Sequence, residues 1–87
     1  MRRWAERRDK AEADIVQALR AYGATVAYLS APGLPDLLVG YQGNTILLEV
    51  KSSRGKVSAA QQEWHVAWCG GPLAVVRNAD EAIRVLK

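Results

Sequence analysis

Two short apolar runs, residues 37–41 and 45–50, restrict the fold of this 87-residue chain more than any other feature. They flank Gln42, Gly43 and Asn44, and a glycine in so short a connection favours a tight reversal of the chain. The pattern therefore predicts a β-hairpin. The second run is almost wholly apolar, which is typical of a strand covered on both sides.

Charged residues stand at the open end of this hairpin. Asp36 precedes the first strand, and Glu49 and Lys51 close the second. The start of one antiparallel strand lies beside the end of its partner, so we expect Asp36 and Glu49 at the same end of the sheet. Because side chains alternate along a strand, Glu49 and Lys51 share a face while Val50 points the other way.

Two carboxylates gathered in this way repel each other, and a divalent cation relieves the repulsion. A few hard oxygen ligands, with room for water and a phosphate, favour Mg²⁺ or Mn²⁺. Lys51 is then placed to orient or activate a water molecule, or to stabilise charge on a phosphate oxygen. The alternative is structural: Asp36 caps a turn, and Glu49 and Lys51 form a solvated strand end.

Length and composition set limits on the rest of the chain. We expect one domain over residues 1–87, and a chain this short buries only roughly 60–65% of its unfolded surface. Cys69 is the only cysteine and excludes an internal disulfide, so dimerisation is the expected source of extra stability. No apolar run approaches the length of a membrane span, and no signal peptide is evident. A soluble, intracellular (cytoplasmic) protein is expected.

The formal charge of +3 is concentrated at the N-terminus. Residues 1–10 hold five basic and two acidic residues, and the remaining 77 hold seven of each. Such a segment favours a polyanionic partner, although arginines also cover ordinary solvated helices. A second basic segment, residues 52–56, directly follows Lys51 and is either a contact for a nucleic-acid backbone or a plain solvated turn. The candidate DNA-binding residues are Arg2, Arg3, Arg7, Arg8, Lys10, Ser52, Arg54 and Lys56.

The first helix is predicted over residues 4–22, ending at Gly23. At about 100° per residue, one broad apolar arc forms, from Ala11, Ile15, Val16, Ala18, Leu19 and Tyr22. Glu12 lies inside this arc, which is unusual for an acidic residue. We interpret Glu12 as a third carboxylate directed at the acidic end of the hairpin. In the alternative, the helix starts later and Glu12 folds back in a variant capping box.

Between this helix and the hairpin, residues 24–30 predict a strand. Residues 31–35, with two prolines and a glycine, predict a stiff loop that holds Asp36 in place. After the hairpin, residues 58–69 predict a helix in which Ser58 and Gln61 have capping-box spacing. Gln61 is open to a second role near the metal.

Three further residues of this helix are aromatic. Trp64 and Trp68, four residues apart, indicate a core or interface face, with base stacking as the less favoured reading. His65 lacks any metal-ligand companion. We therefore favour a structural or surface role for it over a contact with substrate. A strand over residues 72–77 then returns to the sheet in parallel, and Asn78 caps a last helix. The predicted class is α/β, a small mixed sheet flanked by helices in αβββαβα order.

In this order, the motifs resemble the virus-type replication-repair nuclease (VRR-NUC) domain of the PD-(D/E)XK nuclease superfamily. The likeness runs over residues 11–86 and is carried by four pieces: Glu12 in Glu-x-x-Ile-Val-x-x-Leu, Gly33-x-Pro35-Asp36, Glu49-Val50-Lys51, and Ser58-x-x-Gln61-x-x-Trp64.

The resemblance implies an enzyme that hydrolyses phosphodiester bonds in DNA with Mg²⁺ or Mn²⁺. By that likeness, Asp36, Glu49 and the Val50 carbonyl ligate the metal, and Glu12 does so directly or through water. Lys51 would serve the attacking water, and Gln61 would lie beside the site.

Small stand-alone members of this family, from phages, are associated with resolving four-way DNA junctions as dimers. The resemblance therefore implies a structure-selective endonuclease acting as a homodimeric Holliday-junction resolvase, encoded by a bacterium or phage. The alternatives are a non-catalytic DNA-binding or scaffold subunit with the same fold, and a flap or restriction-type nuclease.

Overall fold

The hairpin predicted from the sequence is present in the computed structural model, which describes the backbone of residues 2–87 and the side chains of residues 10–87. Strands β2 (Leu37–Tyr41) and β3 (Asn44–Val50) pair antiparallel, with Tyr41 opposite Asn44. Gln42 and Gly43 both have positive φ, 49° and 83°. This two-residue geometry matches the twist of the strands, and it explains the glycine.

A mixed four-stranded sheet forms around this hairpin, in the order β1-β2-β3-β4. Strand β1 (Thr25–Tyr28) pairs antiparallel with β2, and β4 (Leu73–Val76) pairs parallel with β3. Residues 46–50 of β3 are all buried, as their apolar run predicted. The parallel return of β4 is likewise confirmed.

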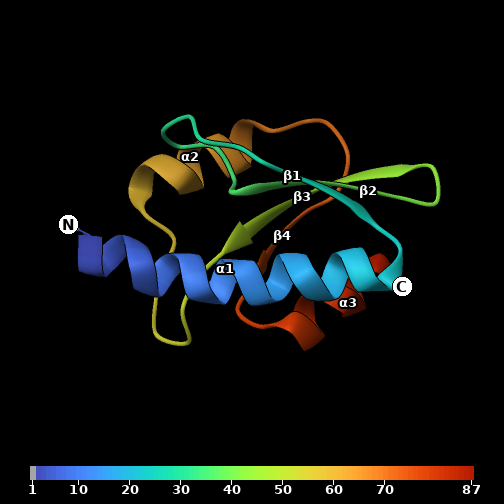
Figure 1. Cartoon of the computed structure of the whole chain (residues 1–87). Coiled ribbons are helices and arrows are strands. Elements are labelled where there is room, and N and C mark those ends of the chain that lie inside the picture. Colours follow the sequence, from blue (N-terminus) through green and yellow to red (C-terminus); the bar gives the residue numbers. More distant parts are fainter. Residues whose placement is uncertain (1) are drawn as a thin grey trace.

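Three helices complete the αβββαβα order: α1 (Arg2–Tyr22), α2 (Ala59–Ala67) and α3 (Ala79–Leu86). Because α1 is continuous from Arg2, Glu12 lies mid-helix, and the alternative of a later start with Glu12 in a capping box is wrong. Figure 1 shows α1 and α3 together on one side of the strands and α2 on the other. No helix in the part of the chain the structure describes has the length and apolarity needed to cross a bilayer.

One face of the sheet, here called the core face, packs against α1 and α3. It belongs to a continuous apolar cluster that also takes in α1 through Ile15, Val16 and Leu19, and α3 through Ala82. Hydrophobic burial of this kind is the main stabilising term in a small domain. The core-face side chains of the hairpin are Leu37, Val39, Ile46, Leu48 and Val50.

The alternating residues make up the opposite face, here called the α2 face. By the two-residue period, its hairpin side chains are those of Asp36, Leu38, Leu47, Glu49 and Lys51. Helix α2 itself has no buried residue. Trp64 and Trp68 stack at 5.1 Å between ring centroids, yet Trp68 is exposed. Of the two places predicted for this pair, core or interface, the core is excluded because α2 buries no residue and does not pack into the apolar cluster, and the interface stays a prediction.

Candidate functional site

Asp36 is held at three points where β2 begins. Its backbone N–H donates to Leu48 O (3.0 Å), and its carbonyl accepts from the Leu29 N–H (2.8 Å). The carboxylate Oδ2 accepts from the Val50 N–H at 2.8 Å, and the side chain is only 5% exposed. The preceding Pro35 is fully buried. Asp36 is therefore fixed in position directly after the loop that was predicted to be stiff.

Glu49 lies on the central strand and is completely buried. Gln61 Nε2 donates to its Oε2 at 2.9 Å, and Lys51 Nζ lies 3.8 Å from the same oxygen. His65 Nε2 lies 3.7 Å from the other oxygen, Oε1. A buried carboxylate is costly unless charge and hydrogen bonds compensate it, and the Gln61 hydrogen bond and the Lys51 ammonium group contribute to that compensation.

The strand register brings Asp36 and Glu49 side by side. The paired register ends at Leu37 and Leu48, and Asp36 and Glu49 are the next residues beyond that pair. The Asp36 carboxylate crosses to the neighbouring strand, where it accepts from the Val50 N–H directly after Glu49. The two carboxylates predicted to meet at one end of the hairpin are thus brought to neighbouring positions.

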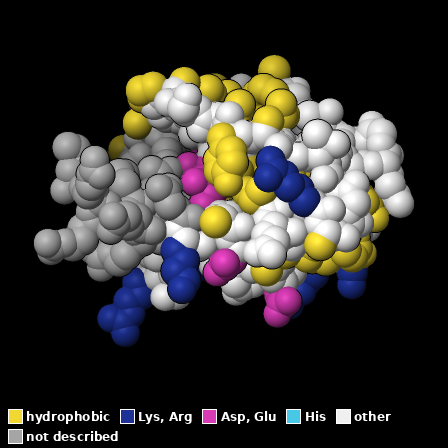
Figure 2. Space-filling model, viewed as in Figure 1, with side chains coloured by type: hydrophobic (Ala, Val, Ile, Leu, Met, Phe, Trp, Pro, Cys, Tyr) yellow, Lys and Arg dark blue, Asp and Glu magenta, His cyan; other side chains and the backbone are white. Residues whose placement is uncertain are grey.

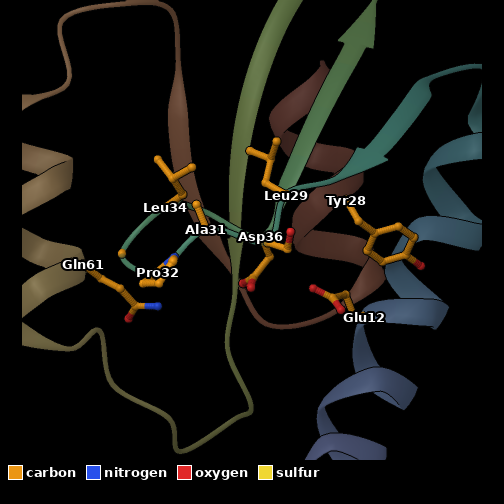
Figure 3. A pocket seen from close by; sticks show the side chains of 10 residues that line it. Glu12, Tyr28, Leu29, Ala31, Pro32, Leu34, Asp36 and Gln61 are labelled. Atoms are coloured by element: carbon orange, nitrogen blue, oxygen red, sulfur yellow. The ribbon is translucent and has the colours of Figure 1, made fainter.

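A pocket of about 440 Å³ opens beside Asp36. Figure 3 shows the carboxylates of Glu12 and Asp36 and the amide of Gln61 directed toward the same space, from α1, the start of β2 and α2. Glu12 is partly buried. The remaining wall is formed by the loop before Asp36 and the end of β1: Tyr28, Leu29, Ser30, Ala31, Pro32, Gly33 and Leu34.

Gln61 combines the two roles that its sequence position suggested. Its Oε1 accepts from the Ser58 N–H at 2.9 Å, and its own N–H donates to Ser58 Oγ at 3.2 Å. This is the predicted capping box at the start of α2. The cap fixes the amide so that Nε2 is directed at Glu49. A helix-capping interaction therefore sets the geometry of the site.

Arg77 was not singled out from the sequence, although it shapes the loop that follows Lys51. Its Nη1 donates to Ser52 O (2.5 Å) and to Gly55 O (2.7 Å). The loop side chains of Ser52, Arg54 and Lys56 are exposed, as is Lys10 on α1. Of the other predicted DNA contacts, the side chains of Arg2, Arg3, Arg7 and Arg8 lie outside the described residues.

His65 is the second residue whose place the sequence did not reveal. It lies four residues after Gln61, so both project from the same side of α2. The signal that could have found it is this spacing from the capping glutamine. As the only histidine, judged to lack a metal-ligand companion, His65 was assigned a structural or surface place. Its ring nitrogen instead lies 3.7 Å from the candidate catalytic carboxylate.

The donor chemistry fits a hard divalent cation. Among residues 10–87, no three His, Cys, Asp or Glu side chains are grouped so that they could hold a metal ion by themselves. A Mg²⁺ site does not need three, because Mg²⁺ is usually bound by one or two carboxylates with waters and substrate phosphates. Asp36 and Glu49, on neighbouring strands, provide two such carboxylates.

Comparison with known proteins bears on the family. No family model and no curated protein matches the sequence. Among solved structures, the chain is similar to one described as a "VRR_NUC domain", with a TM-score of 0.76 and 25% sequence identity. The match covers 90% of this chain and 91% of that one. It confirms the resemblance predicted from the sequence, and the chain has the fold of a VRR-NUC domain.

Proposed function

We propose that this chain is a metal-dependent endonuclease that hydrolyses phosphodiester bonds in DNA. The VRR-NUC fold supports a nuclease domain. The observation that carries the proposal is the pairing of two buried carboxylates, Asp36 and Glu49, with a lysine 3.8 Å from the second. Buried acidic groups beside a cation are costly to maintain without a use, and they are frequent at catalytic sites.

Asp36 and Glu49 are the proposed metal ligands, with the Val50 carbonyl and Glu12 as further donors. A bound Mg²⁺ or Mn²⁺ supplies Lewis-acid polarisation of a phosphoryl oxygen and lowers the pKa of a bound water. The protein's own contribution is preorganisation. The Val50 N–H orients Asp36, and Gln61 orients Glu49, so little rearrangement is required when substrate arrives.

Lys51 is the proposed partner of the attacking water. Glu49 keeps the ammonium group at the α2 face, where it can donate a hydrogen bond to that water or to a phosphate oxygen. Positive charge at this position stabilises the negative charge that develops on the phosphoryl group in the transition state. Gln61 acts through Glu49 and is a positioning residue.

DNA is the proposed partner of the exposed loop after Lys51. Arg54 and Lys56 follow the proposed catalytic lysine directly, so a backbone held by them passes beside the site. Arg77 fixes the loop through two carbonyl groups. On the face shown in Figure 2, the Lys and Arg side chains of the described residues stand apart rather than in one patch, so contacts at several points are expected.

The proposed substrate is branched DNA, cut by a homodimer. The chain has a radius of gyration of 12.4 Å and extends 35 × 28 × 20 Å, about one turn of duplex at its longest. One chain of this size covers one scissile phosphate. A symmetric four-way junction needs two coordinated cuts, and a twofold dimer supplies two related sites.

The test is cleavage of labelled four-way, flap, splayed and linear DNA with Mg²⁺, with Mn²⁺ and with EDTA. We expect metal-dependent cutting, fastest on the four-way junction. Asp36→Asn should abolish cutting, and Asp80→Asn, at an exposed aspartate on α3, should leave it unchanged. Absence of cutting under all conditions, with retained DNA binding, would instead favour a scaffold subunit that keeps the fold of a nuclease.

A further inference from the structure

Two side chains of helix α2 lie close to the two oxygens of the Glu49 carboxylate. Gln61 Nε2 donates to Oε2 at 2.9 Å, and His65 Nε2 lies 3.7 Å from Oε1. The two residues are four apart, so they form neighbouring positions on the same side of α2. Lys51 approaches Oε2, and His65 approaches Oε1.

The His65 nitrogen is placed as a donor. Its side chain is 14% exposed, and Nε2 is buried without a hydrogen-bond partner among the residues that the structure describes. A buried donor left without an acceptor destabilises the protein, so a hydrogen bond to a nearby acceptor is strongly favoured. Glu49 Oε1 lies less than 1 Å beyond hydrogen-bonding distance.

We propose that His65 is a positioning residue for Glu49. When the site is loaded, Nε2–H donates to Oε1, and Gln61 and His65 together fix both oxygens of the carboxylate. This inference rests on the proposed function. Catalytic hydrogen bonds are often long before ligands bind and tighten in the complex, and the contact needs only a small rotation of either side chain.

The physical reason is the rotation of the carboxylate. A hydrogen bond to one oxygen restrains a carboxylate less than hydrogen bonds to both oxygens, because the last torsion of the side chain is a soft one. A second donor on the other oxygen defines the plane in which the lone pairs point at an ion. Partners that orient a ligating carboxylate commonly contribute 10–100-fold to metal affinity or activity.

The experiment measures Mn²⁺ binding by titration calorimetry on the protein without DNA. We expect His65→Ala to weaken Mn²⁺ binding about 10–100-fold. His65→Gln, whose amide nitrogen can donate from a similar reach, should restore it to within a few-fold. Gln62→Ala, at an exposed position on the same helix, serves as the matched control and should match wild type. With DNA, His65→Ala should lower kcat while KM changes little.

Unchanged Mn²⁺ affinity in His65→Ala would overturn the proposal. Failure of His65→Gln to recover would also overturn it, because the ring nitrogen would then act as a ligand rather than as a donor to Glu49. If the wild-type protein binds no Mn²⁺, the metal-dependent function itself fails, and this inference fails with it. If the far-UV circular dichroism spectrum shows that His65→Ala is unfolded, His65→Leu is measured in its place, because leucine keeps the side-chain volume without a hydrogen-bond donor.

Discussion

The two faces of the sheet are made by alternating residues of the same strands, yet they are built on opposite principles. On the core face, Leu37, Leu48 and Val50 join an apolar cluster with α1 and α3. On the α2 face, their sequence neighbours Asp36 and Glu49 are buried among hydrogen bonds and charges. Helix α2 buries no residue of its own and meets the sheet through Gln61 and His65.

This contrast explains how a small chain can maintain a buried acidic site. Apolar packing on one face offsets the cost of desolvating carboxylates on the other, and the rigid strands between them hold the carboxylates in place. We therefore expect substitutions on the core face to act on stability and those on the α2 face to act on chemistry.

The largest expected effect is on the α2 face. Lys51→Ala should lower cutting at least about 1,000-fold, equivalent to roughly 4 kcal/mol of transition-state stabilisation, because it removes the cation beside the proposed reacting water. Junction binding, measured by gel shift, should change no more than about threefold. Lys56→Ala, in the exposed loop, is the control and should lower cutting only a few-fold. Equal loss of binding and cutting in Lys51→Ala would indicate a folding defect and would contradict the assignment of the α2 face to chemistry rather than stability.

Next in size is a pair of leucines from the two faces. Leu48→Ala should destabilise the protein by about 3 kcal/mol, because it leaves a cavity in the core. Leu38→Ala, on the α2 face and 38% exposed, should cost less than about 1 kcal/mol. Urea unfolding followed by circular dichroism measures both. Similar costs for the two variants would show that the α2 face carries as much packing energy as the core face.

Metal binding should stabilise the protein through the α2 face. At a hundredfold excess over its dissociation constant, Mn²⁺ should raise the free energy of unfolding by about 2.7 kcal/mol. Glu49→Gln should abolish this gain while keeping the stability of the metal-free protein, since it removes a buried charge but keeps an oxygen acceptor for Gln61. Thermal melts with and without Mn²⁺ test this. An unchanged gain in Glu49→Gln would remove Glu49 from the ligand set.

The smallest expected effect concerns the N-caps of α2 and α3, which are of the same kind but should differ in what their loss changes. Ser58 accepts from the Gln61 N–H, and Asn78 accepts from the Glu81 N–H. Loss of such a cap commonly costs about 1 kcal/mol. Asn78→Ala should show this cost in global unfolding, because α3 packs into the core through Ala82. Ser58→Ala should barely change global unfolding but should slow cutting, since the cap orients Gln61. The reverse result would contradict the division between the faces.

Much of this fold is readable from local sequence. The glycine turn and the two apolar runs predicted the hairpin, although the turn has two residues and Asn44 already pairs with Tyr41. The spacing of Ser58 and Gln61 predicted the cap of α2. These features depend on residues close together in the chain. The hairpin alone predicted that Asp36 and Glu49 lie at the same end of the sheet, so the proximity of these two residues could be predicted from the sequence.

Other features depend on tertiary contacts that no local pattern reports. Arg77 reaches Ser52, 25 residues away, and such a contact has no spacing rule. Tyr22 was predicted on the buried arc of α1, but it is exposed at the helix end and packs on Tyr41, with 5.5 Å between ring centroids. Trp68 was assigned to a core or interface face because it lies four residues after Trp64, and only the placement of α2 shows that the core does not include it.

The most direct test of the division between the faces is anomalous diffraction from crystals soaked in Mn²⁺. We expect an anomalous peak within coordination distance of carboxylate oxygens of both Asp36 and Glu49, with Gln61 and His65 on the far side of the Glu49 carboxylate. A peak away from these two residues, or none at saturating Mn²⁺, would contradict it.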